Sequence, residues 1–325
     1  MTRIRIPNDY PVELVPPDIT PYRKGNSGID WVHRIASGRP GPVVGITAIV
    51  HGNEPSGAIA LDWLLRSNIR PKSGTLILAF ANTEAYARFD PADPNATRWV
   101  EEDLNRVWSP EVLGGRRDSV ELCRARELRP VIDEIDLLLD IHSMQHATEP
   151  LMLAGPLAKG RELARAVGVP AVVVSDAGHA AGRRLRDYGG FADPGSAKNA
   201  LLVECGQHWE AEAGPRAIET ALRFLQATGS VDPEAGADFL RQRPTPPAQR
   251  LIEVTEAVTV ATDRFAFAEP YRGLETIEKA GTQIATDGDR VIRTPYDDCV
   301  LIMPSRRLWP GQTAVRLGRE LPPTG

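Results

Sequence analysis

A histidine and a glutamate three residues apart, His51 and Glu54 in the segment HGNEP, directly follow the apolar run VVGITAIV. A turn at the end of a strand can aim an imidazole and a carboxylate at one point, and α/β sheets bind ligands at the carboxyl ends of their strands. Alone, the pair is weak evidence, because His-x-x-Glu also occurs in ordinary surface turns. It indicates half of a metal site only if further ligands stand elsewhere in the chain.

Two other apolar runs end in residues of the same kind. DLLLDIHSM places His142 at the end of one run, and ALLVECGQ places Glu204 at the end of another. Two imidazoles and one carboxylate can hold a catalytic zinc, which keeps its fourth position for water. A carboxylate within an apolar run is costly to bury unpaired. Glu204 therefore needs either a structural ion pair or a catalytic role.

The segment RWVEEDLNRVW, residues 98–108, offers groups that could hold a substrate. It is either a charged surface loop or, with a metal nearby, a source of cationic and amide donors. In the second case, Arg98, Asn105 and Arg106 could bind a substrate carboxylate or stabilise an oxyanion.

The elements that must position these residues are short apolar runs, which alternate with segments of helical period. The runs are almost continuously apolar, as strands buried on both faces of a sheet are. We expect strands over 43–50, 75–82, 136–142, 150–155, 171–175 and 200–205, and helices over 56–67, 117–135, 156–168 and 213–229. This alternation predicts an α/β fold, with a parallel or mixed sheet flanked by helices on both faces.

The composition changes after Gly229, a plausible end of the last of these helices. The segment VDPEAGADFLRQRPTPPAQR carries four prolines and reads as a linker. Short alternating or apolar runs follow, with a turn signal at Asp287-Gly288. We therefore divide the chain into a catalytic domain over 1–235, a linker over 236–249 and a small all-β C-terminal module over 250–325.

Composition and charge exclude several classes of partner. Of 325 residues, 42% are hydrophobic and 25% charged, and the formal charge of −5 gives no reason to expect nucleic acid or a membrane surface. No run approaches the roughly 20 apolar residues of a membrane span, and the N-terminus lacks the apolar core of a signal peptide. Cys123, Cys205 and Cys299 argue by number and spacing against a disulfide framework. We expect a cytoplasmic protein that acts on a small molecule and could form homo-oligomers.

The ordered set HGNE, DLNR, DIHS and VECG resembles the aspartoacylase/succinylglutamate desuccinylase family, within the zinc carboxypeptidase superfamily. The resemblance covers about residues 40 to 230, and the β-rich C-terminal part fits the family more loosely. It implies a zinc-carboxypeptidase-like mixed sheet with one bound zinc ion. By position, the resemblance implies that the zinc ligands are His51, Glu54 and His142.

The same resemblance implies roles for residues around the metal. Glu204 becomes the catalytic carboxylate, and Arg98 becomes the group that polarises the substrate carbonyl. Asn105 and Arg106 become ligands of a substrate carboxylate. Asp140 could orient the imidazole two residues later from behind.

Three departures from the family pattern concern the substrate. The segment after the catalytic carboxylate reads ECGQHWE, where the family has a Glu-Val-Gly-Pro-Gln type of sequence. The substrate-binding arginine expected ten residues before Glu204 is replaced by Pro194. Its substitute could be Arg183, Arg184 or Arg186. The C-terminal tyrosine of the family has no clear counterpart, and Tyr296 is the only candidate that we name.

The resemblance implies a zinc-dependent hydrolase that cleaves the amide bond of an N-acyl amino acid or of a related small amide bearing a carboxylate. A carboxypeptidase-type zinc peptidase acting on short peptides is the first alternative, because the metal chemistry is the same. A metal-bearing binding protein without catalysis is the second. Four aromatic side chains near these positions either form a pocket for a larger or planar acyl group or pack in the core: Trp99, His146, His208 and Trp209.

Overall fold

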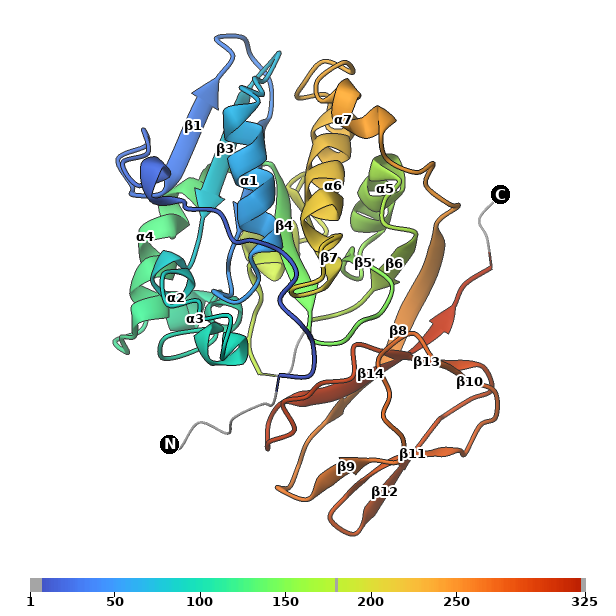
Figure 1. Ribbon diagram of the computed structural model, residues 1–325. Coiled ribbons are helices and arrows are strands. Elements are labelled where there is room, and N and C mark those ends of the chain that lie inside the picture. Colours follow the sequence, from blue (N-terminus) through green and yellow to red (C-terminus); the bar gives the residue numbers. More distant parts are fainter. Residues whose placement is uncertain (1–7, 179–180, 323–325) are drawn as a thin grey trace.

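The protein is built on a mixed sheet of eleven strands, in the order β1-β3-β2-β4-β7-β5-β6-β8-β14-β13-β10 (Figure 1). The structure, a computed structural model, describes residues 8–178 and 181–322. Residues 1–7 and 179–180 of the predicted catalytic domain and the last three residues of the predicted module therefore lie outside the described part.

The strands of the first part of the chain lie within two residues of their predicted bounds. They are β2 (Val43–Ala48), β3 (Thr75–Phe80), β4 (Leu137–Met144), β5 (Leu151–Leu153), β6 (Val172–Ser175) and β7 (Asn199–Gln207). One further strand, β1 (Val32–Ala36), pairs antiparallel with β3 at the edge of the sheet. Its sequence, VHRIA, lacks the apolar run by which the other strands were predicted.

The centre of the sheet places the ends of three parallel strands side by side. β2 and β7 flank β4, and all three run parallel. Ala48 at the end of β2 pairs with Ile141, and the next residue of β4, His142, lies opposite Glu204 on β7. The candidate ligands and the candidate base therefore meet at one edge of the sheet, as the predicted topology requires.

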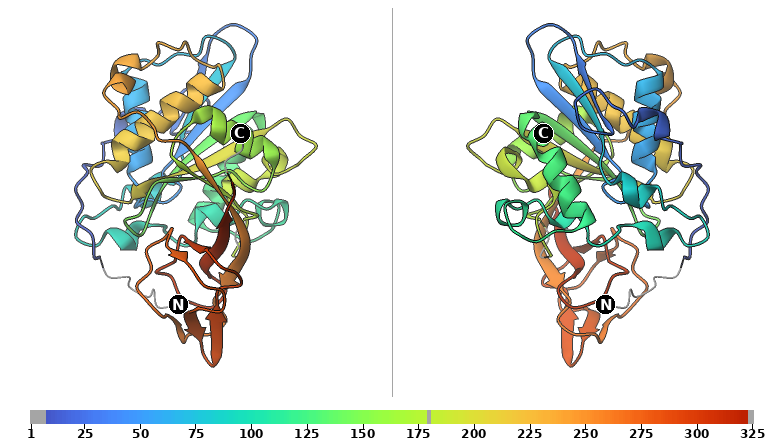
Figure 2. Two further views of the ribbon diagram at one scale, coloured as in Figure 1. Left: turned by 90° about the vertical axis from the view of Figure 1, so that its right-hand side faces the viewer. Right: turned by 90° about the vertical axis from the view of Figure 1, so that its left-hand side faces the viewer.

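Helices cover both faces of the sheet (Figures 1 and 2). α1 (Ser56–Arg66), α5 (Ala158–Val167) and α6 (Ala213–Ala227) pack on one face, and α4 (Val120–Glu134) packs on the other. Leu139 of β4 joins the first core and its neighbour Leu138 the second, because successive side chains of a strand point to opposite faces. Three short helices lie in the connections: α2 (Thr83–Tyr86), α3 (Pro110–Leu113) and α7 (Ala237–Arg241).

The C-terminal module continues the main sheet instead of standing apart from it. β8 (Arg250–Thr259) pairs with β6 on one side and with β14 (Thr313–Glu320) on the other. β13 (Cys299–Ile302) and β10 (Thr276–Ile277) complete the main sheet. A separate small antiparallel sheet contains β9 (Phe265–Phe267), β11 (Gln283–Asp287) and β12 (Arg290–Arg293). The predicted turn at Asp287-Gly288 joins β11 and β12.

The predicted linker over 236–249 is only partly irregular, because it begins with α7. Phe239 of this helix packs on Trp63 of α1, with ring centroids 5.3 Å apart. Three of the four prolines that suggested a linker, Pro244, Pro246 and Pro247, follow α7 in the chain. The division of the chain into two domains stays a prediction.

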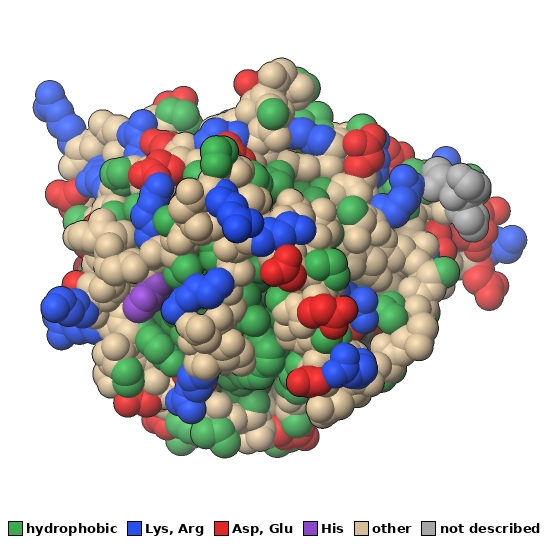
Figure 3. Space-filling view, turned by 90° about the horizontal axis from the view of Figure 1, so that it is seen from above, with side chains coloured by type: hydrophobic (Ala, Val, Ile, Leu, Met, Phe, Trp, Pro, Cys, Tyr) green, Lys and Arg blue, Asp and Glu red, His purple; other side chains and the backbone are tan. Residues whose placement is uncertain are grey.

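The predicted fold class is confirmed: a mixed α/β sheet with flanking helices and a small antiparallel sheet at the C-terminal end. The face opposite the module carries acidic, basic and apolar side chains side by side (Figure 3). All three cysteines are free. Within the described ranges, no helix is long and apolar enough to cross a membrane.

Candidate metal centre

The turn after β2 brings His51 and Glu54 to the edge of the sheet. Ile49 adopts a left-handed backbone conformation (φ 51°), which turns the chain at the end of the strand. Gly52 packs so closely against the neighbouring backbone that a Cβ atom would lie 2.4 Å from the carbonyl carbon of Ala85. Its N–H donates to the carbonyl oxygen of Arg98 (2.9 Å), so the turn also holds the segment that carries this arginine.

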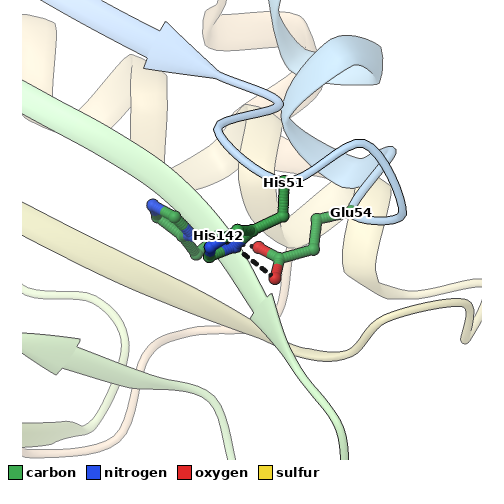
Figure 4. Close-up of side chains that lie close together, drawn as sticks. All are labelled: His51, Glu54 and His142. Carbon is green, nitrogen blue, oxygen red and sulfur yellow. Dashed lines mark hydrogen bonds and ion pairs between the residues drawn. The ribbon is translucent and has the colours of Figure 1, made fainter. Parts of the chain in front are cut away.

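His51, Glu54 and His142 converge on one point (Figure 4). The carboxylate lies between the two imidazoles, with 2.8 Å from His51 Nδ1 to Glu54 Oε1 and 2.9 Å from His142 Nδ1 to Glu54 Oε2. All three side chains are buried, and their ligand atoms lie within 4.8 Å of one another. Two nitrogens and one oxygen at this spacing match the donor set of a zinc site.

In each imidazole the Nε2 atom, which points away from Glu54, contacts a second carboxylate, and we call these two the outer carboxylates. His51 Nε2 lies 2.9 Å from Asp103 Oδ1, and His142 Nε2 lies 2.9 Å from Asp140 Oδ2. Thr47 Oγ1 donates to the other oxygen of Asp140 (2.6 Å). Metal-binding histidines commonly donate their second ring nitrogen to a carboxylate, which fixes the tautomer and makes the inner nitrogen a better ligand.

This donor set fits a divalent cation. If each Nε2 donates its proton to the outer carboxylate, both Nδ1 lone pairs face the oxygens of Glu54. Four lone-pair-bearing atoms that face one another in this way repel one another unless a positive charge lies between them. Burial opposes ionisation of Glu54, but the two imidazoles outweigh it and hold the pKa of the carboxyl well below its usual value. Burial likewise opposes the charge on His142, while Asp140 and Glu54 raise its pKa well above the usual value.

Glu204 stands beside the three ligands on the neighbouring strand. Its side chain is buried, and its Oε2 atom has no hydrogen-bond partner in the described structure. Burial raises the pKa of this carboxyl to about 8; the charge of His142 opposes the shift and that of Glu54 adds to it. A buried carboxyl with a pKa near neutrality can accept and return a proton, as general acid–base catalysis requires.

The segment that contains Arg98, Asn105 and Arg106 lines the same pocket. Arg98 Nη1 donates to Glu54 Oε1 (2.7 Å), and its Nη2 lies 2.8 Å from His51 Nε2. Asn105 Oδ1 accepts the backbone N–H of Leu185 (2.8 Å), which fixes the orientation of the amide group, and its NH₂ group is the part that can donate to a substrate. The structure therefore brings all seven predicted site residues together; their roles stay predictions.

The three arginines named as substitutes at the position of Pro194 are already engaged or lie elsewhere. Arg184 lines the pocket but is bound bidentately by Asp176, at 2.9 Å for each contact. Arg186 donates to the backbone carbonyls of Ala154 and Ala200, and Arg183 is exposed. Among the described residues, none of the three presents an uncommitted guanidinium to the pocket.

Tyr296 does not line this pocket. It lies in a separate hollow of the module, with its hydroxyl 2.5 Å from Thr255 Oγ1 and the guanidinium carbon of Arg319 at 4.3 Å from its ring centroid. The suggestion that it takes the place of the family's tyrosine is not supported.

The four aromatic side chains divide between pocket and core. His146 and His208 line the pocket. Trp209 is 1% exposed and donates its Nε1–H to the carbonyl oxygen of Asn53, and its ring packs at a tilt against that of His208, so it belongs to the core. Trp99 packs against guanidinium groups. Burial lowers the pKa of His208 to about 3, and its Nδ1 lies 2.9 Å from Ser143 Oγ.

Sequence reasoning missed two parts of the site. Asp103 stands in the DLNR motif, but nothing in its spacing shows that it reaches His51 across 52 residues of sequence. Arg307 and Arg316 of the C-terminal module also line the pocket. No local pattern could have placed them there, because their position depends on pairing between β6, β8 and β14.

Comparison with known proteins gives the family. The model of the succinylglutamate desuccinylase/aspartoacylase catalytic domain matches residues 40–230, which is more than half of the chain. The chain belongs to this family. The resemblance predicted from the four motifs is thereby confirmed. The family consists of hydrolytic deacylases, which supports hydrolysis of an acyl-amino-acid amide bond as the general activity.

Solved structures with deacylase names share the fold. Succinylglutamate desuccinylase from Vibrio cholerae has a TM-score of 0.61 at 16% identity, covering 90% of this chain and 86% of that chain. Murine aminoacylase 3 has a TM-score of 0.60 at 18% identity, covering 87% and 96%. A succinylglutamate desuccinylase/aspartoacylase from Rhodobacter sphaeroides has a TM-score of 0.59 at 20% identity, covering 88% and 87%. No curated protein matches by sequence.

Proposed function

We propose that this protein is a zinc-dependent deacylase that hydrolyses the amide bond of an N-acyl amino acid or of a related small amide bearing a carboxylate. The observation that carries the proposal is the placement of His51, Glu54 and His142 beside Glu204, on three adjacent strand ends of a deacylase-family fold. The first three would hold one zinc ion, and the fourth would move the proton.

Zinc bound there would supply a Lewis acid that activates water and polarises the substrate carbonyl. The residues of the chain would do the rest. Glu204 accepts a proton from the attacking water as the new C–O bond forms. The same carboxyl then donates the proton to the nitrogen of the leaving amine as the C–N bond breaks, so one carboxylic acid and one amine are released. The unpartnered Oε2 of Glu204 is available for this transfer.

Arg98 and Arg106 would bind the substrate. Arg98 lies against the metal ligands, 2.7 Å from Glu54 Oε1, where its guanidinium could stabilise negative charge on the carbonyl oxygen. Arg106 lines the pocket, and within the described ranges no carboxylate forms an ion pair with it. Together with Asn105, it would bind the substrate carboxylate.

The C-terminal module favours a small substrate over a peptide. The segment 303–305 lines the pocket together with the metal ligands, so the module forms part of its wall. A wall at this position leaves little room for a long chain on either side of the scissile bond. The alternative of a carboxypeptidase-type peptidase shares the metal chemistry, and it would be identified by activity on blocked dipeptides.

The test combines metal analysis with a substrate panel. The purified protein is expected to contain one zinc ion per chain, to lose activity completely with a strong chelator and to regain it with added zinc. Acetyl, succinyl and aryl-acyl amino acids should be hydrolysed, whereas blocked dipeptides should not. A zinc-free protein that hydrolyses none of these compounds, even after zinc is added, would refute the proposal.

A further inference from the structure

Arg307 of the C-terminal module is fixed at the wall of the pocket. It lies between β13 and β14, lines the pocket and is 6% exposed. Its backbone N–H donates to Ser305 Oγ (2.9 Å), and the preceding N–H, of Arg306, donates to Gln145 Oε1 (3.0 Å). The fold therefore holds this guanidinium at the pocket, instead of letting it reach in from solvent.

Arg307 differs from the other buried arginines of the pocket in its partners. Arg184 is bound by Asp176 and Asp187, and Arg316 Nε lies 3.4 Å from Asp176. No carboxylate of the described chain forms an ion pair with Arg307. A guanidinium stays charged under ordinary conditions, and a buried charge without a counter-charge is costly. The position of Arg307 is therefore unfavourable until an anion arrives.

Trp99 holds the guanidinium in place without neutralising it. The guanidinium carbon of Arg307 lies 5.5 Å from the centroid of this ring, and that of Arg98 lies 5.6 Å from it. A cation–π contact orients a guanidinium but leaves its hydrogen-bond donors free for an oxyanion. Arg98 already has the carboxylates of the metal centre, so Arg307 is the member of this pair that lacks an anion.

The surrounding charges add to this shortage of negative charge. Of the residues that the structure describes, six arginines and three carboxylates line the pocket, and the carboxylates belong to the metal centre and the proposed base. Burial, and then the positive charge of Arg98, lowers the pKa of Arg307 well below its usual value, although Asp103 and Glu54 oppose the shift. An anionic ligand would relieve both the burial cost and the repulsion.

We propose that Arg307 is a specificity-determining residue that binds a carboxylate of the substrate from the side of the C-terminal module. The inference rests on the proposed function, since it concerns the ligand of the same pocket. Trp99 acts as a positioning residue by holding the guanidinium in its bound orientation. The carboxylate could belong to the acyl part, to the amine side chain or to the α-position, and the experiment distinguishes these sources.

The experiment compares substrates that differ by one carboxylate. N-succinyl-leucine against N-acetyl-leucine tests the acyl part, and N-acetyl-glutamate against N-acetyl-glutamine tests the amine side chain. N-acetyl-leucine against its amide tests the α-position. KM and kcat are measured for the wild type, Arg307→Gln and Arg307→Lys. Arg306→Gln is the matched control, because this neighbouring side chain pairs with Asp9 and does not line the pocket.

We expect the wild type to have a lower KM for the acid than for the neutral compound in one of the three pairs. Arg307→Gln should raise KM for that acid on the order of 10- to 100-fold, the cost of removing one partner of a buried charge pair. Its neutral partner and kcat should change little, and Arg307→Lys should restore part of the preference. Equal losses for acid and neutral compound, or a loss confined to kcat, would overturn the proposal. Zinc content and circular dichroism establish that each variant is folded.

A binding measurement separates this inference from the proposed function. The same compounds are titrated calorimetrically into the zinc-loaded protein. If the wild type hydrolyses none of them, the proposed function fails; a preference for an acid that Arg307→Gln abolishes would still support the role of Arg307. A wild type that does not bind any acid better than its neutral partner would overturn the role of Arg307, whatever the activity.

Discussion

The two walls of the pocket differ in how their charges are balanced. On the wall formed by the ends of β2 and β4, the imidazoles of His51 and His142 are paired on both sides, with Glu54 between them and a further carboxylate behind each. On the wall formed by the module, Arg307 lacks an ion pair within the described structure. Arg316 shares Asp176 with a second arginine.

On the first wall the protein itself supplies the partners of the charged groups, whereas on the second a bound ligand would supply them. A group of paired, buried donors keeps its geometry without a substrate, so the metal wall is preorganised for an ion and for the charge that develops during reaction. An unpaired guanidinium is stabilised when an anion binds, so on the inference made above the module wall would select the ligand. Glu204 is the exception among the carboxylates of the metal wall, because its Oε2 atom has no hydrogen-bond partner in the described structure.

The largest expected effect on activity comes from replacing the carboxylate of Glu204. Glu204→Gln keeps the size of the side chain but cannot accept the proton of water. We expect zinc to be retained and kcat to fall by roughly 1000-fold or more, because proton transfer by the base and polarisation at the metal act together. Metal analysis and steady-state kinetics measure the two outcomes. Activity within tenfold of the wild type would show that another group is the base.

The next prediction tests whether the carboxylates behind the two histidines contribute to the affinity of the site for zinc. Asp140→Asn keeps a hydrogen-bond acceptor but removes the negative charge that His142 Nε2 contacts at 2.9 Å. Such changes behind a metal ligand typically weaken metal affinity by about 10- to 100-fold. Competition with a chelator of known zinc affinity measures this change. Asp238→Asn, on the exposed surface of α7, is the control, and equal affinities in all three proteins would remove the role assigned to Asp140.

A third prediction concerns stability against pH in the metal-free protein. Burial raises the pKa of Glu204 from 4.5 to about 8. Below pH 4.5 the carboxyl is protonated in both the folded and unfolded states and has no effect. As the pH rises to 8, only the folded state retains the proton, so the free energy of unfolding falls, by an upper limit of roughly 5 kcal/mol at ~1.4 kcal/mol per pH unit.

The variant Glu204→Gln removes this penalty. We expect the metal-free variant to be more stable than the metal-free wild type by a few kcal/mol at pH 9, and the difference to shrink toward pH 5. Urea unfolding at both pH values measures it. Glu256→Gln, an exposed glutamate on β8, should show no such dependence. A stability difference between variant and wild type that does not change with pH would mean that burial does not raise the pKa of this carboxyl.

The smallest effect is expected from Tyr296→Phe. Its hydroxyl contacts Thr255 in a hollow of the module away from the metal centre. We expect kcat and KM to stay within about twofold of the wild type, because this part of the module does not line the pocket. A large rise in KM would mean that the module moves on substrate binding, and the contrast between the two walls would then need revision.

The metal wall could be predicted from the sequence because its signals are local. His51, His142 and Glu204 each stand at the end of an apolar run, and such runs predict buried parallel strands. The parallel arrangement then brings the strand ends to one edge of the sheet, whatever the exact bounds of each strand. The pairing of Asp103 with His51 depends on how a connecting segment folds back, which no periodicity records.

The module wall could not be predicted, because it depends on pairing between distant segments. Arg307 and Arg316 reach the pocket only through the pairing of β6 with β8 and of β8 with β14. The sequence of β8 indicates a strand but not its neighbours, so the main sheet could not be foreseen to continue into the module. Trp209 is a contrasting case: it stands near Glu204 in sequence, yet it is buried in the core, which was one of the two alternatives left open by the sequence.

The pairing of β8 on both sides has a consequence for the order in which the chain becomes active. In a chain in which β8 has not yet paired with β6, the backbone N–H and C=O groups of β6 are exposed at the edge of the sheet, and such an edge promotes association with other chains. The strand that closes this edge also docks β14, and with it the arginines of the module. Under the proposed function, we expect truncation before β8 to yield an aggregating fragment instead of an unselective amidase.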